Sequence, residues 1–366
     1  MTEVIHSPAP IEATKEQSNS PDWTALAKKA TFARRMRLGL LLAFLTLCSL
    51  PIVLPYFWMF MISFTAKLGE PESGTMWIAC AILGPIILGY GAAHILLPNP
   101  KARLLAGVFM ATAAIGLLYA FIGSEFHFFN YRFFVTPDLI EGTLGKGTVE
   151  GQFPWVWEAF GNSLLLAGAQ TAIVVIVSTL AGYYLSRFAF VGRAGFLQSL
   201  LVLQAFPAMT LIIPIFLISH YAGLLNTLVA PMLVITALEL PFFIFIMKGF
   251  FDAVPWDIEM SALVDGASRK EAFAKVVLPQ VKVGMMAIAI FAFIKGWEEY
   301  IFVSSLRTGS SYWVMSLYLY YVSEDVMGVD YGLVAAVGMF YLMPALLLYV
   351  FTQKYLTQMS VGGIKG

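Results

Sequence analysis

The chain has 366 residues, of which 59% are hydrophobic and only 12% are charged, and its formal net charge is zero. This apolar content exceeds what the core of one soluble domain needs, so the composition predicts a membrane protein. The balanced charge gives no reason to expect nucleic acid as a partner. Cys48 and Cys80 lie inside apolar runs, where small buried side chains are expected rather than a disulfide or a metal site.

Eight apolar stretches are long enough to cross a bilayer as helices. Their expected bounds are 39–63, 76–97, 103–122, 163–186, 196–218, 227–248, 281–304 and 331–352. The fifth stretch contains Pro207 and Pro214, so we expect its helix to be kinked or broken. The sequence therefore predicts an all-α integral membrane protein with about eight transmembrane helices.

The segments outside these stretches set the expected orientation. Residues 1–36 are polar, longer than a signal peptide, and followed by a run long enough to span, so a cytoplasmic tail is expected. Most lysines and arginines fall on one side when both termini are placed in the cytoplasm. The aromatic segment 123–162 is then external, and residues 353–366 form a cytoplasmic tail.

A polar stretch, "DIEMSALVDGASRKEAFAKVVLPQ", separates the sixth and seventh apolar runs. Pro255 suits the first position of a helix, and Gly266 is a helix stop. Ser268 followed by Glu271 is a capping box that begins a second helix, and Pro279 closes it. These signals predict two short amphipathic helices, which either lie on the lipid surface or dock in a groove of another protein.

The same stretch resembles the signature loop of the membrane subunits of binding-protein-dependent ABC importers. That pattern is EAA, three residues, Gly, nine residues, Ile, one residue, Leu-Pro. Its last four marked positions are occupied here by Gly266, Val276, Leu278 and Pro279. The EAA triplet is replaced by Met260, Ser261 and Ala262, with an acid one place earlier at Glu259.

The resemblance extends from residue 162 to the end of the chain. This part of the sequence is similar to the second permease of maltose-type importers. The resemblance is carried by "GLLNT" (223–227), "GFFDAVPWDIE" (249–259), "GWEEY" (296–300) and "GGIKG" (362–366). It implies a six-helix permease core. The hairpin at about 76–122 departs from that six-span pattern and is interpreted as an insertion after the first span. The expected organisation is a tail 1–36, a first span with the inserted hairpin 37–122, an external segment 123–162, a core 163–352 containing a coupling loop 250–280, and a tail 353–366.

The resemblance also implies a function: an ATP-driven importer subunit in the bacterial inner membrane that moves a sugar or oligosaccharide into the cytoplasm. Its implied partners are a second homologous permease, two cytoplasmic ATPase subunits that hold ATP and Mg, a periplasmic sugar-binding protein and membrane lipid. The loop 250–280 would sit in a cleft of the ATPase and couple its closure to transport. The residues expected there are Asp257, Glu259, Met260, Ser261, Ala262, Asp265, Gly266, Phe273, Leu278 and Pro279.

Two points in this loop are specific. A left-handed turn at Gly266 would set the angle between the two helices, and a side chain there would cost roughly 1 kcal/mol. Position 260 lacks the Glu of the family pattern, and Glu259 or Asp257 could supply the missing charge to the ATPase.

Ionisable residues also occur in the seventh apolar run, in "FIKGWEEYIF". Such residues are costly in a membrane unless they are paired or face water. Lys295 and Glu299 are four residues apart and could pair along one helix face, or they could contact the solute. Relatives usually have Trp-Asn-Asp where this chain has Trp-Glu-Glu. The expected substrate pathway is lined by Lys295, Trp297, Glu298, Glu299 and Tyr300.

No catalytic site or metal site is expected in this chain. "EGTLGKGT" (141–148) lacks the Ser or Thr that a phosphate loop needs after Gly-Lys, and the four histidines have no metal-ligand spacing. Two other functions stay open. The cargo could be a polyol or glycerol phosphate, or the chain could be an ion-coupled secondary transporter that uses the charges near Trp297. The two-helix loop argues against the second, because an autonomous carrier has no need for it.

Overall fold

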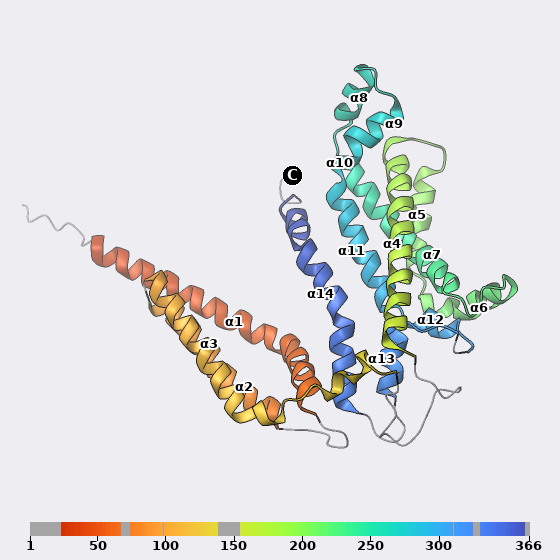
Figure 1. Cartoon of the computed structure of the whole chain (residues 1–366). Coiled ribbons are helices and arrows are strands. Elements are labelled where there is room, and N and C mark those ends of the chain that lie inside the picture. Colours follow the sequence, from red (N-terminus) through yellow and green to blue (C-terminus); the bar gives the residue numbers. More distant parts are fainter. Residues whose placement is uncertain are drawn as a thin grey trace, which may run out of the picture. The chain divides into compact units, whose positions relative to one another are not determined.

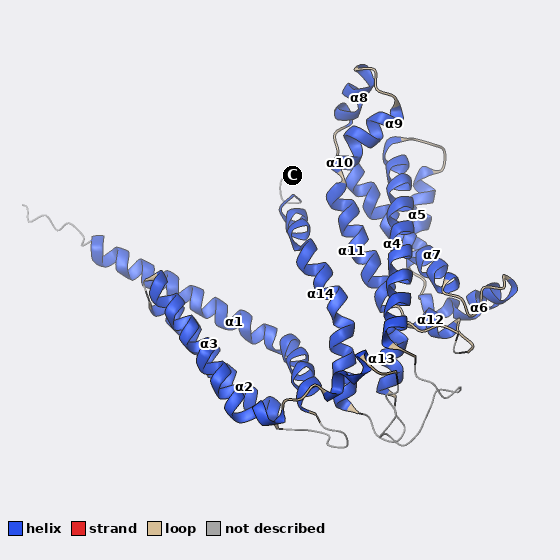
Figure 2. Cartoon of the chain, viewed as in Figure 1, coloured by secondary structure: helices blue, strands red, loops and turns tan. Residues whose placement is uncertain are grey.

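The computed structural model describes residues 23–66, 74–97, 99–137, 154–309, 311–324 and 330–362. Across these residues the chain is helical and contains no strand (Figures 1 and 2). Six helices are long and apolar enough to cross a membrane, and two bent helix pairs raise the number to as many as eight. The prediction of an all-α membrane protein with about eight spans is therefore confirmed.

The chain divides into two units, residues 1–55 with 77–123 and residues 56–76 with 124–366. The helices of the first unit, counting the first part of α1, are α1 (Trp23–Thr65), α2 (Thr75–Leu96) and α3 (Pro100–Ile122). Asn99 caps α3 by accepting a hydrogen bond from the backbone of Lys101 at 3.0 Å. The helices α2 and α3 occupy the range of the predicted hairpin. The helix α1 begins inside the segment expected to be a tail.

The second unit contains the predicted permease core. Its helices are η1 (Gly123–Glu125), η2 (Phe129–Phe134), α4 (Val156–Arg187), α5 (Arg193–Gln204), η3 (Ala208–Leu211), α6 (Ile212–Tyr221), α7 (Val229–Asp252), α8 (Trp256–Val264), α9 (Arg269–Glu271), η4 (Ala272–Val277), α10 (Leu278–Gln280), α11 (Lys282–Glu298), α12 (Ile301–Ser305), α13 (Met315–Ser323) and α14 (Tyr331–Gly362). The last helix continues through residues that the sequence assigns to a tail.

The helices α4, α7 and α11 form the centre of this unit (Figure 1). Glycines allow close approach on both sides of α4. At Gly182 an added Cβ would lie 2.9 Å from the backbone nitrogen of Lys248 in α7. At Gly296 of α11 it would lie 2.9 Å from the Cα of Ala167 in α4. Small residues of this kind bring helix backbones into contact within a membrane, where lipid supplies no hydrophobic driving force.

Proline breaks the fifth apolar run as predicted. The helices α5 and α6 meet at a bend of 91°, with η3 between them. Pro207 precedes η3 in an extended conformation, and Pro214 lies in the first turn of α6, where a missing N–H costs little. Just before the break, the Gln204 side chain at the end of α5 donates to the backbone oxygen of Leu238 in α7 at 2.8 Å.

The seventh run differs from its predicted extent of 281–304. The helix α11 ends at Glu298, and Glu299 has an extended backbone. The Glu299 carboxylate accepts the backbone N–H of Phe302 at 2.8 Å and so caps α12. Glu299 therefore lies at the end of α11 and caps the start of α12.

Contacts at the end of the second unit opposite α8 hold α14 in place. Arg132 of η2 forms an ion pair with Asp330 at 3.3 Å, and Asp330 caps α14 through the backbone N–H of Leu333. The buried Asn130 side chain donates to the backbone oxygens of Ser63 and Ala66. The segment 123–162 therefore contributes packed structure rather than a loose loop wherever it is described.

Candidate functional site

The helix α8 ends in a turn that requires glycine. Gly266 has φ of +91°, its N–H bonds to the Leu263 oxygen at 3.1 Å, and the N–H of Ala267 bonds to the Ala262 oxygen at 3.0 Å. This pair of bonds is a Schellman motif, whose left-handed residue is usually glycine. The predicted left-handed turn at Gly266 is confirmed.

The second helix of the loop begins at the predicted capping box. The Ser268 hydroxyl accepts the N–H of Glu271, and the Glu271 carboxylate accepts the N–H of Ser268 at 3.0 Å. The bonds from the backbone and hydroxyl of Ser268, with Lys275 beside them, lower the pKa of Glu271 to about 2. A charged Glu271 at this helix start therefore persists well below neutral pH.

A π-helical segment, η4, follows within the same helix and was not predicted. The N–H of Leu278 reaches back to the oxygen of Phe273, five residues earlier. Pro279 gives the physical reason, because its ring would clash with the carbonyl of Lys275 in a regular α-helix. The wider turn accommodates this ring, and at Val281 the chain bends by 71° into α11.

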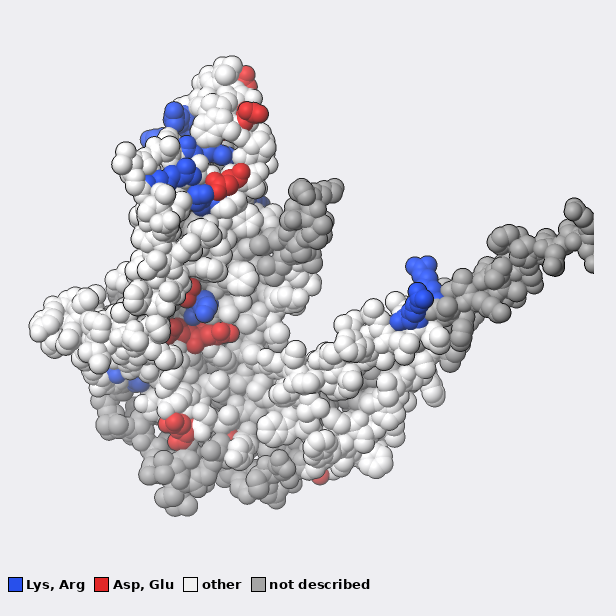
Figure 3. All heavy atoms as spheres, turned by 180° about the vertical axis from the view of Figure 1, so that it is seen from behind, with Lys and Arg blue, Asp and Glu red and all other residues white. Residues whose placement is uncertain are grey.

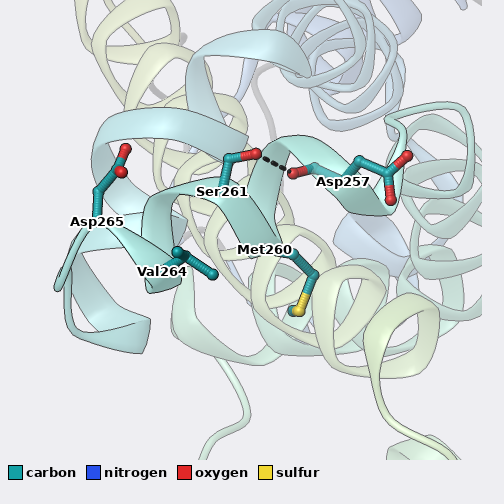
Figure 4. A pocket seen from close by; sticks show the side chains of 5 residues that line it. All are labelled: Asp257, Met260, Ser261, Val264 and Asp265. Atoms are coloured by element: carbon teal, nitrogen blue, oxygen red, sulfur yellow. Dashed lines mark hydrogen bonds between the residues drawn. The ribbon is translucent and has the colours of Figure 1, made fainter.

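One face of α8 points away from the rest of the chain. It is formed by Asp257, Met260, Ser261, Val264 and Asp265, which line a shallow hollow of about 350 Å³. Figure 4 shows Met260 and Val264 between the two aspartates, with the Ser261 hydroxyl donating to the backbone oxygen of Asp257 at 2.8 Å. The Val264 side chain is 87% exposed. The spacing of these residues follows the helical period, so they form one continuous outward face.

The opposite face of α8 carries a buried acid. Glu259 is 2% exposed, and its Oε2 forms an ion pair with Nε of Arg187 at 3.0 Å. The hydroxyl of Tyr183 donates to its Oε1 at 2.6 Å. The hypothesis that Glu259 supplies a charge to the ATPase is wrong, because its carboxylate is buried and paired with Arg187 and Tyr183 of the same chain.

Four other predicted coupling residues hold the loop in place or shape it. Ala262 is buried beside Glu259, and Phe273 and Leu278 pack against a buried cluster that includes Phe251 and Val277. Pro279 is exposed and produces the π-helical turn. The predicted residues thus divide into an outward face and a group that packs inward.

A second candidate site lies where the fifth run is broken. A cavity of about 410 Å³ is lined by Pro207, Ala208, Met209, Ile235, Leu238, Glu239, Lys295, Glu299, Ile301 and Phe302. Figure 3 shows acidic and basic atoms side by side midway along the second unit, apart from the charged cluster at the end that carries α8. Lys295 interacts electrostatically with both Glu239 and Glu299. Three ionisable groups thus face one cavity between candidate spans.

Glu239 was missed by the sequence reasoning, although a signal was present. It is an acid inside the sixth apolar run, in "ALELPFF", and such a residue is a functional candidate by default. The expected ion pair between Lys295 and Glu299 is absent from the described residues. The Glu299 carboxylate bonds to the backbone of α12 instead.

The neighbours of these residues divide between core and surface. Trp297 is 2% exposed, stacks on Tyr341, and donates from Nε1 to the Tyr341 oxygen at 3.1 Å. It packs inside the unit and is not among the residues that line the cavity, so its place beside the substrate pathway stays a prediction. Glu298 is exposed, and Tyr300 is half-buried with its ring 4.6 Å from that of Tyr320.

The described residues contain no group of three or more metal-ligating side chains. The segment "EGTLGKGT" (141–148) lies outside the described residues. The two candidate sites are the outward face of α8 and the charged cavity.

Comparisons with known proteins agree with this arrangement. A family model described as "Binding-protein-dependent transport system inner membrane component" matches residues 175–359. The diacetylchitobiose uptake system permease protein DasC of Streptomyces coelicolor is 31% identical over 211 residues, which covers 57% of this chain and 76% of DasC. The trehalose transport system permease protein SugB of Mycobacterium tuberculosis is 30% identical over 232 residues, which covers 63% and 75%.

A solved structure has the same fold. It is described as a bacterial ABC transporter involved in the import of the acidic polysaccharide alginate, and its matching chain aligns with a TM-score of 0.57. The alignment covers 87% of this chain and 95% of that one at 18% sequence identity. At this identity the match concerns the fold alone.

Proposed function

Because this chain belongs to the family of inner membrane components of binding-protein-dependent transport systems, we propose that it is the permease subunit of an ATP-driven sugar importer. A second permease would complete the membrane domain, and two ATPase subunits would bind ATP and Mg. A sugar-binding protein would deliver the solute from the opposite side. Both termini would lie in the cytoplasm, on the side of the loop 250–280.

The observation that carries this proposal is the outward face of α8. An apolar centre, Met260 and Val264, lies between Asp257 and Asp265 on a helix at one end of the second unit (Figures 1 and 4). Such a helix fits a groove with an apolar floor and basic groups at its ends. The ATPase subunit is the partner that would offer this groove.

Sugar as the cargo is supported by the relatives and by the cavity. DasC and SugB are named for the uptake of diacetylchitobiose and trehalose. A cavity of about 410 Å³ lies within the range of small-molecule sites. Glu239 and Glu299 offer acceptors for sugar hydroxyl groups, and Lys295 offers donors. We assign solute contact to these three residues.

The test is capture of partners by the tagged chain, extracted from membranes in mild detergent. Wild type should recover an ATPase and a second permease. Val264→Glu should lose the ATPase and keep the second permease, because the new charge would be buried in the proposed groove.

The matched control is Val191→Glu, a substitution at another exposed valine, in the turn between α4 and α5. It should keep both partners. Recovery of wild-type chain without an ATPase, or equal capture by the Val264→Glu variant, would contradict the proposed docking face.

A further inference from the structure

A joint of three side chains connects α8 to the end of α4. Arg187 lies in the last turn of α4, and its side chain is 5% exposed. Its Nε faces the carboxylate of Glu259 at 3.0 Å, and Tyr183, one turn earlier on α4, donates to the other carboxylate oxygen at 2.6 Å. Two side chains of α4 thus contact both carboxylate oxygens of Glu259 in α8.

Arg187 also fixes the segment that leads into α8. Its Nη2 donates to the backbone oxygen of Val254 at 2.9 Å, and its guanidinium lies 5.3 Å from the ring of Trp256. The side chain therefore contacts α8 and the residues just before it. Rotation of α8 about its own axis would break several of these contacts together.

The second helix of the loop is attached to the same end of α4. The ring of Phe273 lies 4.5 Å from that of Tyr183, and the guanidinium of Arg269 lies 5.4 Å from the ring of Phe188. Ser186 of α4 donates to Asp252 at the end of α7 at 2.6 Å. The last residues of α4 thus contact both loop helices and the helix that leads into them.

The helix α4 also packs against the two helices that contribute Glu239 and Lys295 to the charged cavity. It contacts α7 at Gly182 and α11 at Gly296, in each case at a distance that excludes a Cβ. The cavity residues Glu239 and Lys295 lie on those two helices. A displacement of α4 therefore shifts α7 and α11, which carry cavity residues, because helices in such close contact cannot move independently.

We propose that Arg187, Glu259 and Tyr183 are positioning residues that join the loop 250–280 rigidly to α4, so that the two move together. This inference rests on the proposed function: movement of α8 by the ATPase passes through the joint into α4, and from α4 into the helices that line the cavity. A buried ion pair is a poor source of stability, since apolar side chains would pack there at less cost. Its orienting contacts account for its presence.

The experiment uses the complete transporter in proteoliposomes loaded with ATP, and measures sugar uptake and ATP hydrolysis on the same vesicles. Glu259→Gln keeps the shape of the side chain and removes its charge. The complex should assemble and hydrolyse ATP, while sugar transported per ATP should fall by about 2- to 30-fold, the range expected when a coupling element is weakened. Tyr183→Phe should lower the same ratio by less.

A double variant, Arg187→Gln with Glu259→Gln, separates coupling from folding. It leaves no uncompensated buried charge, so the thermal midpoint should recover relative to Glu259→Gln alone. The ratio of sugar to ATP should stay low, because the ion pair is still missing. If the ratio recovered together with the midpoint, the pair would be merely structural and the inference would be overturned.

Arg132→Gln is the matched control, since it breaks the other ion pair that joins distant helices in the described residues, at the far end of the unit. It should lower the thermal midpoint and leave the ratio of sugar to ATP at the wild-type value. If Glu259→Gln fails to fold, the double variant and Tyr183→Phe decide the question. A wild-type ratio in both would overturn the joint, whereas a wild-type complex without ATP-dependent uptake would overturn the proposed function itself.

Discussion

Replacement of either of two glycines in the second unit should destabilise the protein, for a different physical reason at each position. Gly266 has φ of +91°, and an added Cβ would meet nothing within 4 Å. Gly182 has an ordinary helical backbone, but its Cβ would lie 2.9 Å from the nitrogen of Lys248 and 3.0 Å from the carbonyl carbon of Met247. The first position is restricted by conformation and the second by space.

The magnitudes follow from this difference. Gly266→Ala should cost about 1 kcal/mol, the penalty of a left-handed backbone for a residue with a Cβ. This is about a fivefold loss in the population of the correct turn. Gly182→Ala should cost about 1–3 kcal/mol, because two helix backbones must move apart.

Asparagine distinguishes the two mechanisms. It tolerates the left-handed region, so Gly266→Asn should be milder than Gly266→Ala. At position 182 the order should reverse, because Asn is larger than Ala and the obstacle is backbone.

The assay is the thermal midpoint of the purified chain in detergent, together with ATPase capture at a fixed concentration. Gly266→Ala should weaken capture with a small change in midpoint, and Gly182→Ala should lower the midpoint most. Equal effects of Ala and Asn at both positions would refute the reasoning.

Four further outcomes are expected. Ser268→Ala should weaken ATPase capture by removing an N-cap worth about 1 kcal/mol, as measured by titrating the ATPase. Because the pKa of Glu271 is lowered to about 2, below that of the unfolded chain, its stabilising effect is complete above the ordinary carboxyl pKa of about 4.3 and is lost only as pH falls toward 2. Capture should thus be unchanged from about pH 6 to 8, and a titration in that range would contradict this. Lys295→Met should slow sugar uptake more than Lys295→Arg, because two carboxylates then face the cavity without a cation; equal initial rates would exclude a role for the charge. Trp297→Phe should lower the thermal midpoint through the loss of one hydrogen bond worth about 1 kcal/mol to Tyr341, with uptake per folded complex unchanged.

Local signals in the sequence predicted the shape of the loop 250–280. Gly266, Ser268 and Pro279 each act within a few residues of themselves, so their effects on helix ends can be read from the chain alone. The apolar runs likewise predicted the spans, because length and hydropathy are local properties. The break at Pro207 follows from the same reasoning.

The direction of individual side chains was beyond such signals. Glu259 faces inward, where its carboxylate forms an ion pair with Arg187. That pairing depends on the packing of two helices far apart in sequence. Lys295 and Glu299 have the right spacing for a pair, but α11 ends between them and Glu299 caps α12 instead. Glu239 was visible as an acid in an apolar run, yet only the cavity joins it to Lys295.

The most direct test of the account is sugar uptake by proteoliposomes that contain this chain, its partner permease and the ATPase. Uptake should require ATP inside the vesicles and a sugar-loaded binding protein outside, and it should stop when either is withheld. Uptake that proceeds without ATP, driven by an ion gradient across the vesicle membrane, would contradict the importer and make Glu239, Lys295 and Glu299 the coupling site of a secondary transporter.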